Sequence, residues 1–90
     1  MNMNLIEVLV NEYDEKNWEN YASLFEDADK RIEGIPQDVV NVVFGVLGDK
    51  TGYSWLLMPF DVFDGKTASD LLKSPEGAKA LKAFIMRLPI

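Results

Sequence analysis

Apolar residues recur at helical spacing through the first third of the chain. Ile6, Leu9, Val10 and Tyr13 lie at i, i+3, i+4 and i+7, which predicts a first helix over about residues 3–14. A second set with the same period predicts a second helix, ended by Gly34 as its C′ residue. Its members are Trp18, Tyr21, Ala22, Phe25, Ala28 and Ile32. The acids between these positions are expected on solvated faces.

Residues 36–58 are compatible with two structures. Pro36 can start a helix over residues 39–47 that ends at Gly48, since proline suits the beginning of a helix. The apolar residues of 39–46 are mostly β-branched or aromatic, however, and 48–52 has the composition of a hairpin loop. The periodicity therefore leaves a helix and a β-hairpin at about 39–58 as alternatives.

Start and stop signals divide the rest of the chain into short helices. Pro59 ends the segment before it, because proline lacks an amide donor, and Gly65 permits a turn. Thr67 is a predicted N-cap with Asp70 at N3, a capping-box arrangement. Ser74 starts a second helix immediately afterwards, with proline at its first position.

The last predicted helix covers about residues 75–88. Its apolar stripe lies on one face, with Phe84 beside it and Met86 pointing away. Arg87 falls near the C-terminal end, where a cation interacts favourably with the helix dipole. The stripe consists of Ala78, Leu81, Ile85 and Leu88.

A set of residues from Trp55 onward is expected to be structural: Trp55, Leu56, Pro59, Phe63, Gly65, Thr67, Leu71, Leu72, Gly77 and Leu81. The order and spacing of this set resemble the toxin-binding domain of Xre/MbcA/ParS-type antitoxins, over about residues 39–88. Ala68 stands where that family usually has proline, and the chain stops at Ile90 where the family tends to continue into a glycine-containing tail.

The resemblance implies a mainly α, compact domain of about five to six short helices. It favours the helical alternative for 36–58, with Asp49 capping a short helix that carries Trp55. A single domain over 1–90 is expected, with an acidic helical part at 1–36 and the antitoxin-like region at 37–90. A clear helix-turn-helix is absent.

Composition restricts the possible chemistry. The chain has no cysteine and no histidine, which excludes disulfides, the usual zinc sites and the commonest general base. Only carboxylates remain as catalytic groups. Asp61 and Asp64 lie in one loop, but the alternating acids of a calcium-binding loop are missing, so we interpret them as a solvated turn. We expect no enzymatic activity, metal or cofactor.

Charge is distributed unevenly along the chain. Residues 1–38 hold ten acids and three bases, whereas residues 39–90 hold five acids and six bases. Clustered Lys and Arg, which duplex binding requires, are not found, so direct nucleic-acid binding is not expected. No apolar run reaches the roughly 20 residues of a membrane span, and the first residues lack the basic start of a secretion signal. We expect a cytoplasmic protein without membrane contact.

Two functional hypotheses follow. The resemblance implies an antitoxin-like protein that occludes the active site of a RES-domain toxin, an enzyme that destroys NAD. The expected partner contacts are at the C-terminal end: Met86, Arg87, Leu88, Pro89 and Ile90. A homodimer through the apolar faces at 6–13 and 18–32 is also possible. The alternative is an acidic nucleic-acid mimic, such as a phage-type inhibitor of a DNA-binding protein, because residues 1–38 are so acidic.

Overall fold

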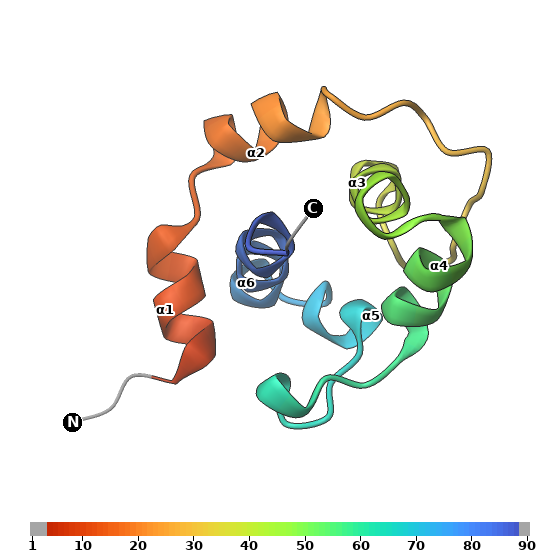
Figure 1. The fold of residues 1–90 in the computed structure, drawn as a ribbon. Coiled ribbons are helices and arrows are strands. Elements are labelled where there is room, and N and C mark those ends of the chain that lie inside the picture. Colours follow the sequence, from red (N-terminus) through yellow and green to blue (C-terminus); the bar gives the residue numbers. More distant parts are fainter. Residues whose placement is uncertain (1–3, 89–90) are drawn as a thin grey trace.

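The computed structural model describes residues 4–88, and within this range the fold is mainly α-helical, as expected (Figure 1). The elements, in chain order, are α1 (Leu5–Glu12), α2 (Glu15–Ala22), α3 (Gln37–Leu47), α4 (Asp49–Leu57), the 3-10 helix η1 (Asp61–Phe63), α5 (Ala68–Leu71) and α6 (Pro75–Met86). The β-structure among residues 4–88 is confined to an isolated bridge between Phe60 and Lys66.

Helix α6 lies in the middle of the fold, and the other helices surround it (Figure 1). Leu81 and Ile85 of α6 are fully buried. They share one core with Leu9 of α1 and Trp18 of α2, and with apolar residues of α3, α4 and η1. The acidic N-terminal part therefore contributes side chains to the same core as the helices that follow residue 36.

The segment 36–58 forms two helices, so the hairpin alternative is wrong. Helix α3 is enclosed by its neighbours, and Val39, Val40, Val42 and Val43 are fully buried. Its run of β-branched residues thus reflects burial on several faces, which outweighs the modest helix propensity of valine. Gly48 joins the two helices with φ of +85°.

The expected capping of α4 by Asp49 is also wrong. Gly48 is at once the residue that ends α3 and the residue that precedes α4, and no side chain caps α4. Asp49 is instead the first helical residue. Its carboxylate there still interacts favourably with the positive end of the helix dipole.

The second helix ends ten residues earlier than the predicted Ile32. Helix α2 stops at Ala22, and residues 23–36 run as an irregular segment along α3. Side chains of α3 satisfy its backbone: Asn41 Oδ1 accepts the Ala28 amide at 2.8 Å, and Gln37 Nε2 donates to the carbonyls of Ala28 and Lys30, both at 3.1 Å. The apolar residues after Ala22, namely Phe25, Ala28 and Ile32, are partly buried against the core but are not helical. Their helical spacing therefore predicted burial correctly and the helix wrongly.

The start and stop signals after residue 58 are confirmed. The turn between η1 and α5 has Asp64 and Gly65 at φ of 58° and 81°. Thr67 Oγ1 accepts the Asp70 amide at 3.2 Å, and Asp70 Oδ2 accepts the Thr67 amide at 3.1 Å, which completes a capping box. This backbone hydrogen bond lowers the pKa of Asp70. At the start of α6, Ser74 Oγ accepts the Gly77 amide at 3.0 Å.

Candidate partner-binding surface

An aromatic cluster fixes the position of α6 relative to α4 and η1. The ring of Trp55 stacks on that of Phe84, with centroids 6.2 Å apart and an interplanar angle of 11°. Phe63 meets the same Phe84 ring edge-on at 5.2 Å, and Phe60 lies 4.8 Å from Trp55. Aromatic pairs of this kind contribute more stabilising free energy than the burial of their apolar area alone, and they favour one geometry. Trp55 and Phe63 of the expected structural set are thus part of this cluster.

Gly77 lets the first turn of α6 lie directly against the end of α5. A Cβ atom at this position would lie 2.1 Å from the carbonyl oxygen of Leu71, well inside van der Waals contact. The glycine at position 77, one of the residues that carry the resemblance, therefore has a steric reason. Ser74, which caps the helix, lies beside the same contact.

The remaining members of the structural set have varied environments. Leu56, Leu71 and Leu81 are buried and Leu72 is half-buried. Pro59 is exposed between α4 and η1, and Gly65 is exposed in the turn between η1 and α5. Thr67 is the capping residue of α5. Together these residues hold α4, η1, α5 and α6 as one packed unit.

The C-terminal end of α6 presents two of the expected partner contacts. Met86 is 37% exposed and Arg87 follows it at the end of the helix. Leu88 is half-buried and packs against the core, so it anchors the end of the chain. Pro89 and Ile90 lie outside the described residues. Met86 and Arg87 are therefore the contacts that the described surface offers.

Arg87 forms an ion pair with Glu12, a residue that sequence reasoning missed. Arg87 Nε donates to Glu12 Oε2 at 3.1 Å, and Arg87 NH2 donates to Glu12 Oε1, giving a bidentate pair. Both side chains are about half exposed, at 46% and 47%. An exposed pair of this kind contributes at most about 1 kcal/mol. No pattern in the sequence links Glu12 with Arg87, because they lie near opposite ends of the chain.

A shallow cleft of about 150 Å³ lies beside this ion pair, between the α1–α2 junction and α6. Tyr13 forms part of its wall, with Lys82 Nζ 6.0 Å from the tyrosine ring. Burial, followed by the nearby carboxylates, raises the pKa of Tyr13. The lining residues are Glu12, Tyr13, Asp14, Asn17, Ala83, Met86 and Arg87.

The apolar faces that suggested dimerisation are largely used within the chain. Leu9 and Trp18 are buried, and Trp18 Nε1 also donates to Asp38 Oδ2 at 2.9 Å. The other apolar residues of α1 and α2 pack partly buried against the same core. Leu9 and Trp18 are therefore not available for self-association, whereas Ile6 and Val10 still line a hollow on the surface of α1.

Two further features concern metals and membranes. Within residues 4–88, no group of three or more His, Cys, Asp or Glu side chains is arranged to hold a metal ion. Asp61 and Asp64 are both exposed, at the first position of η1 and in the turn that follows it. None of the helices described has the length and apolarity needed to cross a membrane.

Comparison with protein-family models, with curated proteins and with solved structures gave no match for this chain.

Proposed function

We propose that this protein is a non-enzymatic, antitoxin-like domain that binds a RES-type toxin and covers its active site. The observation that carries the proposal is the placement of Met86 and Arg87. They lie exposed at the end of α6. Trp55 and Gly77, two of the residues that carry the resemblance, hold this helix in a fixed position. A rigid helix end with an arginine and an adjacent apolar side chain is a suitable interface anchor, since such residues commonly dominate binding energy.

The ion pair with Glu12 is compatible with this role. The toxin would offer Arg87 a carboxylate or other acceptor in place of Glu12, and release of an exposed pair costs little. Met86 and the residues that follow Arg87 would supply apolar contact around it. Binding would exclude NAD from the toxin by steric occlusion, without any chemical step on this chain.

Co-expression with a RES-domain toxin, scored by rescue of growth and by co-purification, tests the proposal. Wild-type protein should rescue growth and form a complex. Arg87→Glu should lose the complex, because it reverses the charge at the anchor. This substitution also places a second carboxylate beside Glu12, which repels it within the protein. A variant is therefore needed that removes the arginine from the partner contact without this repulsion.

The charge swap Glu12→Arg with Arg87→Glu provides that separation. It restores an ion pair at the same place but leaves no arginine at the end of α6. The swap should be as stable as the wild type in thermal unfolding and still fail to bind the toxin. Full binding by the swap would remove Arg87 from the contact, and absence of any complex with the wild type would reject the toxin as partner.

A second candidate function rests on the exposed acids of the N-terminal part. Of the ten acids in residues 1–38, only Asp38 is not exposed, and it is bonded to Trp18. A surface of this charge could occupy the site of a basic nucleic-acid-binding protein. Its signature would be binding to such a protein that weakens steeply as salt concentration rises. Binding that is insensitive to salt would exclude this mode.

A further inference from the structure

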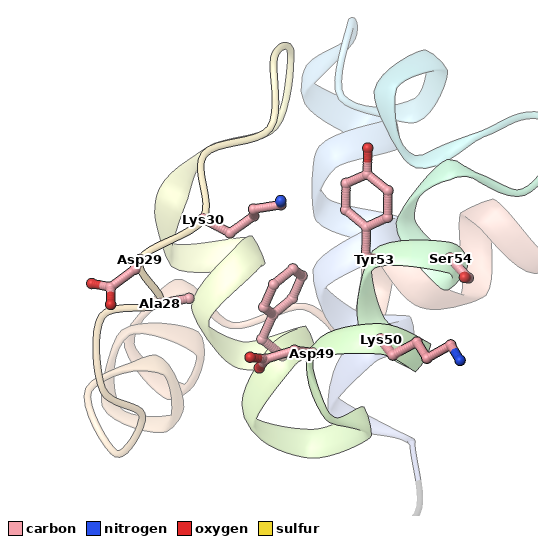
Figure 2. Close-up of a pocket in the computed structure, with 8 residues that line it drawn as sticks. Ala28, Asp29, Lys30, Asp49, Lys50, Tyr53 and Ser54 are labelled. Carbon is pink, nitrogen blue, oxygen red and sulfur yellow. The ribbon is translucent and has the colours of Figure 1, made fainter.

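A groove of about 560 Å³ separates the 28–30 segment from α4 (Figure 2). Phe44 of α3, 7% exposed, contributes the buried aromatic part of its lining. Tyr53 of α4 is 42% exposed and forms the opposite wall. A volume of this size is in the range of sites that accept small molecules or protruding side chains.

The outer wall of this groove is fixed before any ligand arrives. The Ala28 amide is bound by Asn41 Oδ1, and its carbonyl accepts from Gln37 Nε2 and, at 2.7 Å, from Arg31 NH1. The carbonyl of Lys30 accepts from Gln37 as well. A wall held in place by α3 loses little conformational entropy on binding, which favours affinity.

A second hollow of about 300 Å³ continues the groove past Asp49. It shares Ala28, Phe44 and Asp49 with the first. Leu24 lines it and is 77% exposed, the highest fraction among the large apolar side chains described. The combined surface thus carries apolar side chains at both ends, Leu24 at one and Tyr53 at the other.

The charges around this surface are predominantly negative. Four acids line the two hollows, namely Glu26, Asp27, Asp29 and Asp49, against the two lysines Lys30 and Lys50. Figure 2 shows the Asp49 carboxylate pointing across the groove toward the 28–29 segment, while Lys50 extends away from it.

Lys30 and Asp27 are already engaged within the protein. Lys30 Nζ lies 5.3 Å from the centre of the Tyr53 ring, and Asp27 pairs with Arg31 at 3.2 Å. Asp49 forms no ion pair or side-chain hydrogen bond with the rest of residues 4–88. Asp29, the other acid that lines the first hollow, likewise has no such partner among residues 4–88, but Figure 2 shows its carboxylate pointing away from the groove. Asp49 is therefore the carboxylate that a ligand in the groove would meet.

We propose that this groove is a docking site for a segment of a partner protein that carries an apolar side chain next to a lysine or arginine. The apolar side chain lies between Phe44 and Tyr53, and the basic group pairs with Asp49. The groove is built by α3, α4 and the 28–30 segment, and it shares no lining residue with the cleft at the end of α6. The assignment therefore stands or falls separately from the proposed toxin contact.

Selection of a phage-displayed random-peptide library on the full chain tests this assignment. We expect enriched peptides in which Lys or Arg lies within a few positions of an aliphatic or aromatic residue. Synthetic copies of them should bind about fivefold more weakly to Asp49→Asn and about tenfold more weakly to Tyr53→Ala. Their amide chemical-shift changes should fall on residues 24–30 and 44–54.

Matched control variants come from outside the groove. Asp61→Asn neutralises another exposed acid at the first position of a helix, and Val62→Ala shortens another exposed apolar side chain. Both should bind the peptides like the wild type. The assignment is overturned if no peptide family is enriched, if the enriched peptides lack basic residues, or if Asp49→Asn and Tyr53→Ala bind them unchanged.

Discussion

Among the glycines, Gly77 is the one at which an added Cβ would make the shortest contact. In an open helix, replacing glycine with alanine stabilises by about 1 kcal/mol. Here the new methyl group would collide with the Leu71 carbonyl oxygen, and overpacking of this kind costs about 1–3 kcal/mol. We predict that Gly77→Ala lowers the free energy of unfolding, as measured by urea denaturation followed by circular dichroism.

Lys79→Ala is the matched control, because Lys79 is exposed on the same helix. Its free energy of unfolding should stay within about 0.5 kcal/mol of the wild type. A Gly77→Ala protein as stable as the wild type, or more stable, would show that α5 and α6 can move apart without cost.

At the scale of elements, residues 23–36 depend on α3 for their conformation. Asn41 Oδ1 accepts from both the Ala28 amide and Gln37 Nε2. We predict that Asn41→Ala destabilises the protein by about 1–3 kcal/mol, because it leaves a partly buried donor unsatisfied. Hydrogen exchange of the Ala28 amide should accelerate more than that of amides within α3, since the segment opens locally first.

Asn11→Ala provides the comparison, because Asn11 is exposed on α1. It should change neither the stability nor the exchange of Ala28. Slow exchange of the Ala28 amide in Asn41→Ala would mean that the segment holds its shape through its apolar contacts alone.

Across the whole molecule, one core joins the acidic N-terminal part to the helices that follow residue 36. Leu9 of α1 is fully buried in it, alongside residues of every other α-helix. We predict that Leu9→Ala lowers the free energy of unfolding by about 2–5 kcal/mol. The loss should also appear as faster hydrogen exchange at Leu56 in α4, because two regions that share a core unfold together.

Leu24→Ala makes the same chemical change at a side chain that is 77% exposed. Its effect on stability should be below about 0.5 kcal/mol. Unchanged protection of Leu56 in Leu9→Ala would contradict cooperative unfolding and would mean that the two parts open independently.

Features that depend on neighbouring residues could be predicted from the sequence alone. The ends and caps at Pro59, Thr67 and Ser74 were predictable, because proline and short polar side chains act on the backbone within a few positions. The apolar stripe of α6 was predictable from its period, and so was the exposure of Met86.

Other features depend on residues that are distant in the sequence, and these were set by the tertiary structure. The end of α2 follows from hydrogen bonds offered by α3, and the helical state of α3 follows from burial of its valines by surrounding elements. The partner of Arg87 and the groove beside Tyr53 arise only when separate segments meet. Local propensity carries no information about such contacts, because chain topology brings them together.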